Sequence, residues 1–122
     1  MHELSVCQSL LRAAEKTAAE HGARGIVTVT VAVGPLSGVE APLLARAFTV
    51  ARMGTMAEGA ELEIEAMPVR VWCEACEIET ETAANALLCG GCGSWQVGLK
   101  SGDELLLKSL ELAPADNLAK AG

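Results

Sequence analysis

The first three residues, Met1-His2-Glu3, could together bind a metal ion. Because the histidine stands at position 2, the α-amine, the intervening amide nitrogen and the imidazole can close fused chelate rings on one ion. Nitrogen donors in a tetragonal arrangement suit Ni(II) or Cu(II) better than Zn(II). Most histidines near a chain start bind nothing, so the rest of the sequence has to decide whether this terminus is a metal site.

A second group, of four cysteines, could also bind metal. They form two Cys-x-x-Cys pairs with twelve residues between the pairs: Cys73, Cys76, Cys89 and Cys92. A two-residue gap lets one tight turn aim two thiolates at one ion, and two such turns complete a tetrahedral set of sulfurs. Gly90, Gly91 and Gly93 permit the backbone conformations that such turns need. We therefore predict a metal site here, with zinc as the leading ion.

This ion is predicted to have a structural role, because four thiolates leave no coordination position for water or substrate. Metal binding would also supply the folding energy of a segment with little core. Two alternatives stay open. A rubredoxin-like iron centre has the same ligands, and a Cys-x-x-Cys pair can be redox-active, although two pairs this close fit one metal better. A nucleic-acid-binding ribbon fits poorly, since residues 69–101 carry four glutamates against Arg70 and Lys100.

The composition narrows the class of protein further. The formal net charge of −7 argues against nucleic acid as a partner, because a basic patch is the usual footprint of such binding. No run of about 18 apolar residues could cross a membrane, and the chain start has no features of a signal peptide. We expect a cytoplasmic protein whose five cysteines are thiols or metal ligands. No catalytic constellation is found, so we expect no enzyme activity.

Apolar periodicity predicts the elements that hold these residues. Residues 4–20 should form a helix with one buried stripe, made of Leu4, Cys7, Leu11, Ala14 and Ala18. The helix would fix His2 and Glu3 at its first turn, and Cys7 should be a buried, inert thiol. Residues 26–33 are apolar or small on both faces and should form a central strand.

Three further elements are predicted around the cysteines. Ser37 and Glu40 have capping-box spacing and should start a second helix that runs to about residue 53. Residues 61–66 alternate between apolar side chains and glutamates, which is typical of a strand with one solvated face. Residues 104–112 should form a last strand, with Leu106, Leu110 and Leu112 on one face.

The cysteine segment interrupts this series of elements. If the last strand returns to the first sheet, residues 1–68 and 102–112 form one α/β domain, and residues 69–101 are an insertion in it. The predicted fold class is α+β: a small three-stranded sheet with two helices, plus an inserted zinc-ribbon-like module with four cysteine ligands. Residues 113–122 are rich in alanine and have little to bury, so we expect a flexible tail.

With both metal-binding groups placed, the chain resembles the HypA/HybF family of hydrogenase maturation factors, which are nickel metallochaperones. Besides the four cysteines, the segments that carry the resemblance are residues 1–5 (MHELS), 36–40 (LSGVE), 58–62 (EGAEL) and 101–105 (SGDEL). The matches run in order to about residue 112. Members often have proline after the first cysteine of a knuckle, where Glu74 and Gly90 stand here, which should alter turn rigidity but not ligation.

The resemblance implies a function and partners. Nickel would be bound around His2, with the Met1 amine and with Glu3 assisting, and zinc would be held by the four cysteines. The implied partners are a HypB-type nickel GTPase and the precursor of a nickel–iron hydrogenase large subunit, and some relatives serve urease as well. The competing hypothesis is a zinc-stabilised protein-interaction module that delivers no nickel.

Overall fold

The structure is a computed structural model that describes residues 2–114. Within this range two helices and six strands follow one another along the chain. Their order is α1 (His2–Glu20), β1 (Gly25–Val33), α2 (Ala41–Ala51), β2 (Glu61–Ala66), β3 (Val69–Cys73), β4 (Ile78–Thr82), β5 (Val97–Ser101) and β6 (Leu105–Ala113). Neither helix is long and apolar enough to cross a membrane.

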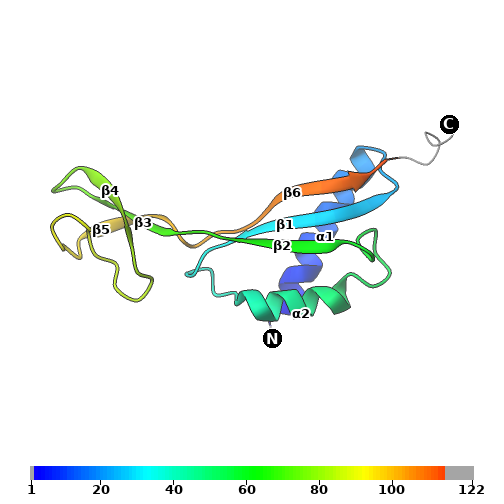
Figure 1. Cartoon of the computed structure of the whole chain (residues 1–122), viewed down its shortest axis with the longest axis horizontal. Helices are drawn as coiled ribbons and strands as arrows, with labels where there is room; N and C mark the ends of the chain where they lie inside the picture. Colours follow the sequence, from blue (N-terminus) through cyan, green and yellow to red (C-terminus); the bar gives the residue numbers. More distant parts are fainter. Residues whose placement is uncertain (1, 115–122) are drawn as a thin grey trace. The chain divides into compact units, whose positions relative to one another are not determined.

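The first sheet has three strands in the order β2-β1-β6 (Figure 1). β1 is therefore the central strand that its two apolar faces predicted, and its residues 29–33 are all buried. The Gly34 amide donates to the Glu104 carbonyl at 2.8 Å, and the Arg24 amide donates to the Ala113 carbonyl at 3.0 Å. The end of β1 thus lies beside the start of β6, and the start of β1 lies beside the end of β6, so the two strands are antiparallel. The last strand does return to the first sheet.

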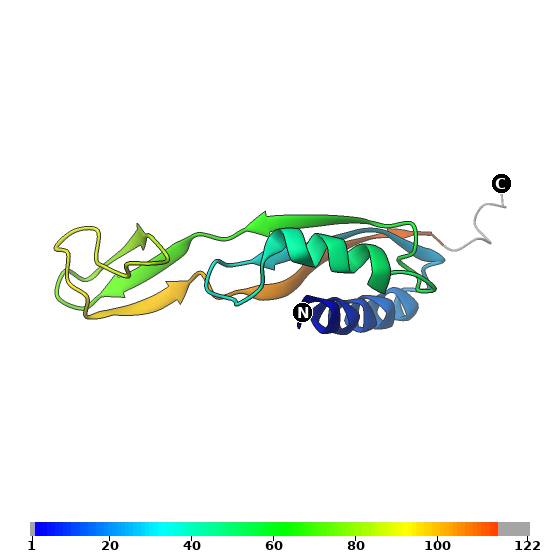
Figure 2. The same ribbon diagram turned by 90° about the horizontal axis from the view of Figure 1, so that it is seen from below.

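The two helices pack against each other and cover the same face of this sheet (Figures 1 and 2). Apolar side chains from both helices and from β1 meet there: Cys7, Leu11, Val29, Leu44 and Phe48. All five are less than 5% exposed, so they form the apolar core that holds α1 in place. Each such side chain contributes about 1.5–3 kcal/mol on burial.

The buried stripe of α1 differs from the prediction at its first position. Four of the five predicted residues are buried, but Leu4 is 40% exposed and Glu3 takes its place in the core at 4%. The placement of Leu4 was wrong because the Glu3 carboxylate has an internal partner. The Glu40 amide donates to Glu3 Oε2 at 3.3 Å, and a carboxylate can be buried only when it is paired or hydrogen-bonded in this way.

The second helix begins without the predicted capping box. Glu40 is its N-cap residue but makes no side-chain cap hydrogen bond, and Ser37 Oγ instead accepts the Val39 amide at 3.1 Å. Serine commonly bonds to a backbone group two residues ahead in such a turn. Pro42 in the first turn is compatible with the start observed here. The helix ends at Ala51 with Arg52 as its C-cap residue, within two residues of the predicted end.

The last strand is less regular in burial than predicted. Leu106 is 55% exposed, whereas Leu110 and Leu112 are partly buried. The three leucines therefore do not share one apolar environment, although they have the same parity along β6. β2 fits its prediction better, because its three glutamates are exposed and Leu62 and Ile64 are partly buried.

The cysteine segment contains a second three-stranded sheet, in the order β4-β3-β5, and both outer strands run antiparallel to β3. The sequence analysis missed these strands because each has only five residues and β4 alternates with glutamates. Cross-strand pairing supports β4 instead: Arg70 Nε donates to Glu79 Oε2 at 2.6 Å. Trp72, in the middle of β3, stands opposite Glu79 on one side and Gly98 on the other.

The described chain divides into two compact units. The first comprises residues 2–31, 40–64 and 107–114, and the second comprises residues 32–39 and 65–106. The predicted fold class is confirmed: α+β, with two helices on a three-stranded sheet and a four-cysteine module inserted before the last strand. Ala113 ends β6, and the tail predicted after it lies outside the described residues apart from Pro114.

Two glycines of the second unit approach each other closely. The Leu36 amide donates to the Gly102 carbonyl at 2.7 Å, and a Cβ added to Gly34 would lie 2.1 Å from that carbonyl oxygen. Gly102 has a φ of 121°, and its own amide donates to the Glu104 carboxylate at 2.9 Å. A side chain at either position would force the backbone apart or strain it. This explains the glycine of the SGDEL segment.

Candidate metal centres

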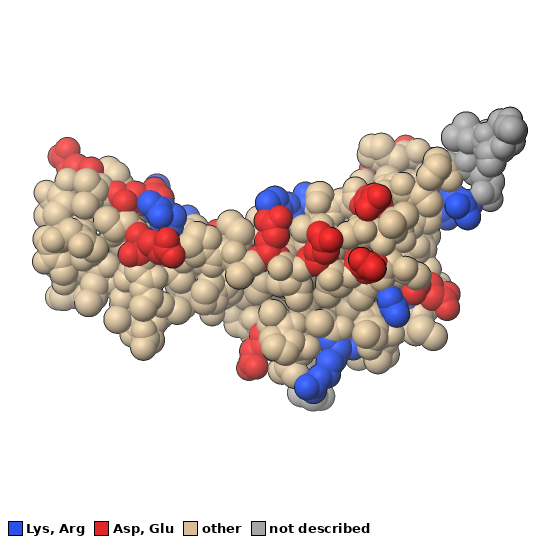
Figure 3. Space-filling view, viewed as in Figure 1, with Lys and Arg blue, Asp and Glu red and all other residues tan. Residues whose placement is uncertain are grey.

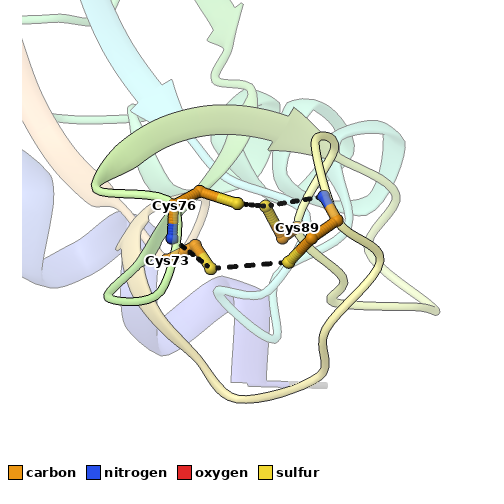
Figure 4. Close-up of side chains that lie close together, drawn as sticks. Cys73, Cys76 and Cys89 are labelled. Carbon is orange, nitrogen blue, oxygen red and sulfur yellow. Dashed lines mark hydrogen bonds between the residues drawn. The ribbon is translucent and has the colours of Figure 1, made fainter.

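The second sheet brings the four cysteines together. Cys73 is the last residue of β3, Cys76 follows in the turn to β4, and Cys89 and Cys92 lie in the loop between β4 and β5. That loop is attached to β4, because Thr80 Oγ1 accepts the Gly90 amide at 2.8 Å. Figure 4 shows the thiols of Cys73, Cys76 and Cys89 pointing toward one another.

The spacing of the sulfur atoms fits one tetrahedral ion. All four Sγ atoms lie within 4.8 Å of one another, with Cys73 to Cys92 at 3.8 Å and Cys76 to Cys89 at 4.0 Å. Zinc–sulfur bonds of about 2.3 Å in a tetrahedron place the sulfurs about 3.8 Å apart. Zinc would therefore fit here with little movement of the side chains. Within residues 2–114, these four cysteines are the one group of at least three potential metal ligands whose ligand atoms lie this close together.

The two knuckles have the same backbone geometry although their sequences differ. In each, the amide of the residue after the second cysteine donates to the carbonyl of the first: Glu77 to Cys73 at 2.7 Å, and Gly93 to Cys89 at 2.9 Å. These two donors share a positive φ, of 55° at Glu77 and 76° at Gly93. The turn thus needs one left-handed residue, and in the first knuckle a glutamate adopts that conformation.

Only one of the three predicted turn glycines has this backbone role. Gly90 and Gly91 do not have positive φ, so the explanation given for them was wrong. Space is instead tight at both positions: an added Cβ would lie 3.0 Å from a Thr80 carbon at Gly90 and 3.0 Å from Ile78 Cδ1 at Gly91, so these neighbouring side chains would have to shift by a few tenths of an ångström. The loop therefore packs closely on β4 at these two positions.

Replacing Gly93 by alanine should weaken the second knuckle through backbone strain alone. Nothing lies within 4 Å of an added Cβ at Gly93, so the expected loss of about 1 kcal/mol comes from its left-handed φ. Gly98→Ala is the matched control, because its Cβ also meets open space but its φ is not positive. Thermal unfolding of metal-loaded protein measures both variants, and equal melting temperatures for the two would contradict the strain.

The protein environment shifts the pKa values of two of the clustered thiols, Cys89 and Cys76, in opposite directions. The Cys92 and Gly91 amides donate to Cys89 Sγ at 3.5 and 3.2 Å and lower the pKa of Cys89 to about 6. A hydrogen bond with the Cys92 thiol, followed by burial and the other neighbouring sulfurs, raises the pKa of Cys76 to about 12. A metal ion that binds at neutral pH must displace the Cys76 proton, so acid opposes binding.

The other predicted metal site stands at the start of α1. The His2 side chain is 57% exposed, whereas that of Glu3 is only 6% exposed, and His2 Nε2 lies 3.8 Å from Glu3 Oε2. A hydrogen bond with the α-amino group, and then the hydrogen bond from the Glu40 amide, lower the pKa of the Glu3 carboxyl to about 2. Glu3 is therefore ionised and buried, beside an imidazole that solvent can reach. Met1, the third predicted nickel ligand, lies outside the described residues.

The contact between Glu3 and the Glu40 amide is a feature that sequence reasoning missed. It links the first turn of α1 to the N-cap of α2, across 37 residues of chain. Both residues belong to segments that carry the family resemblance, MHELS and LSGVE. No spacing rule connects positions so far apart, so only the resemblance itself could have drawn attention to the pair.

The remaining histidine and cysteine have ordinary structural environments, and that of Cys7 is the buried one that was predicted. His21 is exposed just after α1, with Nδ1 2.9 Å from the Thr17 carbonyl oxygen. Cys7 is 2% exposed, and its thiol donates a hydrogen bond to the Leu44 carbonyl oxygen at 3.5 Å. Burial, followed by the charge of Glu3, raises the pKa of Cys7 to about 11.

Cys7 should resist alkylation in the native protein. With a pKa of about 11, only about one thiol in a thousand is the reactive thiolate at pH 8, and the side chain is buried. Mass spectrometry after iodoacetamide treatment should find Cys7 modified only in denaturant. Cys92, which is exposed, serves as the comparison once a chelator has removed any metal. Native labelling of Cys7 as fast as of Cys92 would contradict this expectation.

Comparison with known proteins covers almost the whole chain. Residues 1–112 match a family model described as hydrogenase/urease nickel incorporation, metallochaperone, hypA. The hydrogenase maturation factor HypA of Nitrosospira multiformis is 49% identical over 112 residues, which are 92% of this chain and 97% of the relative. The HypA of Aquifex aeolicus is 45% identical with the same coverage.

Solved structures of relatives have the same fold. The solution structure of the Ni metallochaperone HypA from Helicobacter pylori is 31% identical, with a TM-score of 0.69, and the alignment covers 93% of this chain and 99% of that one. A second solution structure, of a HypA protein, is 32% identical with a TM-score of 0.70, covering 92% and 96% of the two chains.

Proposed function

We propose a nickel-delivery function on one premise: the chain belongs to the HypA family of hydrogenase maturation factors, which are nickel metallochaperones. In this proposal the chain binds Ni(II) at its N-terminus and delivers it, in the cytoplasm, for the maturation of a nickel–iron hydrogenase. The observation that carries the proposal is the exposed imidazole of His2 at the start of a well-packed helix, beside the buried carboxylate of Glu3.

The start of α1 suits a chelate that uses a backbone nitrogen. The first four N–H groups of any α-helix have no acceptor within the helix, and His2 is the first residue of α1. Nickel could therefore take the His2 amide nitrogen without breaking a helical hydrogen bond. The α-amine and His2 Nδ1 would complete the fused rings, because Nδ1 closes a six-membered ring with the amide whereas Nε2 cannot.

Glu3 would then support the nickel site without ligating the ion. Its carboxylate faces His2 Nε2, the nitrogen that the chelate leaves over, and ligating histidines usually give their second N–H to a carboxylate or carbonyl. The positive end of the α1 dipole disfavours a cation at the helix start, and the negative charge of the carboxylate offsets this effect. A site with both effects can bind nickel and still release it, as delivery requires.

For the cysteine cluster, we propose zinc with a structural role. The sulfur spacing supports zinc, and the closed set of four thiolates supports a role without exchange or catalysis. We assign residues 69–101 as the zinc-binding domain, and residues 1–68 with 102–112 as the nickel-binding domain. The metal-site positions and the domain boundaries are parts of this proposal.

The proposed partners are a HypB-type nickel GTPase and the hydrogenase large-subunit precursor. The names of the relatives support a role with the hydrogenase maturation machinery, and the family description also includes urease. The alternative is a zinc-stabilised interaction module without nickel delivery. One observation favours it: Trp95 in the cysteine segment is 74% exposed, as at a protein-binding surface. Metal stoichiometry separates the two functions.

The central test is a calorimetric titration with nickel chloride of zinc-loaded protein that has its authentic N-terminus. We expect one tight zinc and one weaker nickel per chain, with nickel affinity falling as the pH is lowered because the donors must be deprotonated. His2→Ala should abolish specific nickel binding and leave the zinc content unchanged. His21→Ala is the matched control. If His2→Ala, or residues added before Met1, left nickel binding unaltered, the chelate would be excluded.

A substitution series at Glu3 should distinguish support from ligation. Loss of a carboxylate that orients a ligating histidine typically lowers metal affinity about 10- to 100-fold without changing stoichiometry. We therefore expect Glu3→Ala to bind one nickel more weakly, and Glu3→Gln, which keeps a polar group facing Nε2, to lie between it and the native chain. The same calorimetric titration measures all three proteins. A complete loss of binding in Glu3→Gln would instead mark the carboxylate as a ligand.

A further inference from the structure

Glu3 is an exception among the charged residues of this chain. Within residues 2–114 it is the one charged side chain that is buried, at 4% exposure. Figure 3 shows several other acidic side chains of the first unit standing out at the surface of one face. A carboxylate can be buried only when hydrogen bonds or charges compensate for the lost water. The partners of Glu3 therefore indicate what its burial achieves.

Two helix starts converge on this carboxylate. α1 and α2 begin at the same end of the first unit (Figures 1 and 2). The Glu40 amide, at the N-cap of α2, donates to Glu3 Oε2 at 3.3 Å, and a hydrogen bond with the α-amino group acts on the same carboxylate. The groove that Glu3 lines between the helices has otherwise apolar walls, made of Leu4, Leu43 and Ala47. The α2 side chains in this groove cannot donate hydrogen bonds, so α2 acts on Glu3 through its backbone.

We propose that the Glu40 backbone amide is a positioning group of the nickel site: it fixes the Glu3 carboxylate, which in turn orients the imidazole of His2. This inference rests on the proposed function, in which His2 Nδ1 binds nickel. The oxygen that accepts the Glu40 amide, Oε2, is also the one that faces His2 Nε2 at 3.8 Å. A carboxylate oxygen can accept two hydrogen bonds, so one anchors the group and the other is offered to the imidazole in a fixed direction.

The anchor matters because an unanchored side chain costs affinity. A glutamate without the Glu40 amide would have to be ordered at the moment when nickel binds, with a loss of side-chain entropy. Held in advance by α2, the carboxylate has already lost that freedom on folding. The packed start of α2 thus contributes to nickel affinity without touching the ion.

The amide of Glu40 can be removed without removing a hydrogen bond of the helix. As the N-cap residue, Glu40 starts α2 with its carbonyl, which accepts the Leu44 amide at 2.9 Å. Its own amide precedes the helix and has no acceptor within it. Its side chain is exposed and makes no cap hydrogen bond. The proposed role therefore belongs to the backbone of Glu40 and not to its carboxylate.

The test compares two substitutions of this residue by calorimetric titration of the zinc-loaded full chain with nickel chloride. Glu40→Pro removes the amide donor, whereas Glu40→Ala keeps it and is the matched control. Proline requires a φ of about −65°, so the φ of −97° at Glu40 needs a modest adjustment. Glu40→Pro should weaken nickel binding about tenfold, as expected for a group that orients a ligating histidine, with stoichiometry and zinc content unchanged. Glu40→Ala should bind nickel as the native chain does.

A double-mutant cycle separates positioning from a general disturbance of the fold. If the amide acts through Glu3, Glu40→Pro should have no further effect on nickel affinity in a chain that already carries Glu3→Ala. Equal weakening by proline in both backgrounds would show that it disturbs the site by another route, and the inference would be overturned.

Amide hydrogen exchange of the native chain gives a second measurement, which needs no variant. Coupling between two interactions is reciprocal, so nickel should strengthen the hydrogen bond between Glu40 and Glu3 and slow exchange of the Glu40 amide by up to about tenfold. The Gly90 amide is the matched control, because it also donates to a side-chain oxygen, that of Thr80, but in the second unit. Its exchange should not change.

The remaining outcomes separate this inference from nickel delivery itself. If nickel binding depended on His2 but was the same in Glu40→Pro, the positioning role would be refuted and delivery would stand. Nickel binding that is independent of His2, or no nickel binding at all, would refute both. If circular dichroism showed that Glu40→Pro does not fold, exchange of the native Glu40 amide would decide, and an unchanged rate with nickel bound would overturn the inference.

Discussion

Replacing Cys73 and Cys76 by serine should abolish zinc retention and unfold residues 69–101, while α1 keeps its helical structure. The second sheet has little else to hold it, because the buried apolar side chains on its strands are Val69 and Val71 besides Cys73. Structural zinc sites contribute about 10–16 kcal/mol of binding free energy, which is comparable with the entire stability of a small domain.

Three measurements check this expectation. Elemental analysis should show the loss of zinc, backbone amide exchange should show the loss of protection in β3, β4 and β5, and protection in α1 should persist. Cys7→Ala is the control, because it removes a cysteine outside the cluster and should leave the zinc content unchanged. An unchanged zinc content in the double variant would show that these cysteines do not hold the ion.

Gly34→Ala should be the most destabilising of the glycine-to-alanine changes. The new Cβ would lie 2.1 Å from the carbonyl oxygen of Gly102 and 2.3 Å from its carbonyl carbon, so backbone rather than a flexible side chain has to move. That movement would disturb the hydrogen bonds from Gly34 to Glu104 and from Leu36 to Gly102. Overpacking alone typically costs about 1–3 kcal/mol, and we expect the upper end of that range or more.

The change should lower the melting temperature by on the order of 10 °C, as followed by circular dichroism. Gly59→Ala is the matched control, because no atom lies within 4 Å of its added Cβ and its φ is not positive. That control should melt close to the native protein. If Gly34→Ala did the same, the close approach of these two glycines could not be important for stability.

The elements of the first sheet could be predicted because their patterns are local. β1 is apolar on both faces and lies in the centre of the sheet, and β2 alternates and has one exposed row of glutamates. β3, β4 and β5 could not be predicted in this way. Each is short, and β4 is held by partners elsewhere in the chain, such as Arg70 opposite Glu81 and Glu79 opposite Trp72. Apolar periodicity does not report such pairing.

The metal sites were predictable to different degrees for the same reason. The spacing of the cysteines alone indicated one ion, and the sulfurs do converge. The family resemblance, confirmed by the match over residues 1–112, indicated the N-terminal residues. The burial of Glu3 was not predictable, because an isolated carboxylate at a helix start is normally solvated. Its partner is a backbone amide 37 residues away, which only the folded chain brings near.

The positions of the aromatic residues have a practical consequence for spectroscopy. The chain has no tyrosine, and both tryptophans, Trp72 in β3 and Trp95 before β5, belong to the second unit. Intrinsic fluorescence therefore follows the cysteine-bearing unit alone. Both helices belong to the first unit, so the helical signal in far-ultraviolet dichroism follows that unit. Coincident unfolding curves from these two probes would show one cooperative transition, and separate curves would give the stability of each unit from a single unlabelled sample.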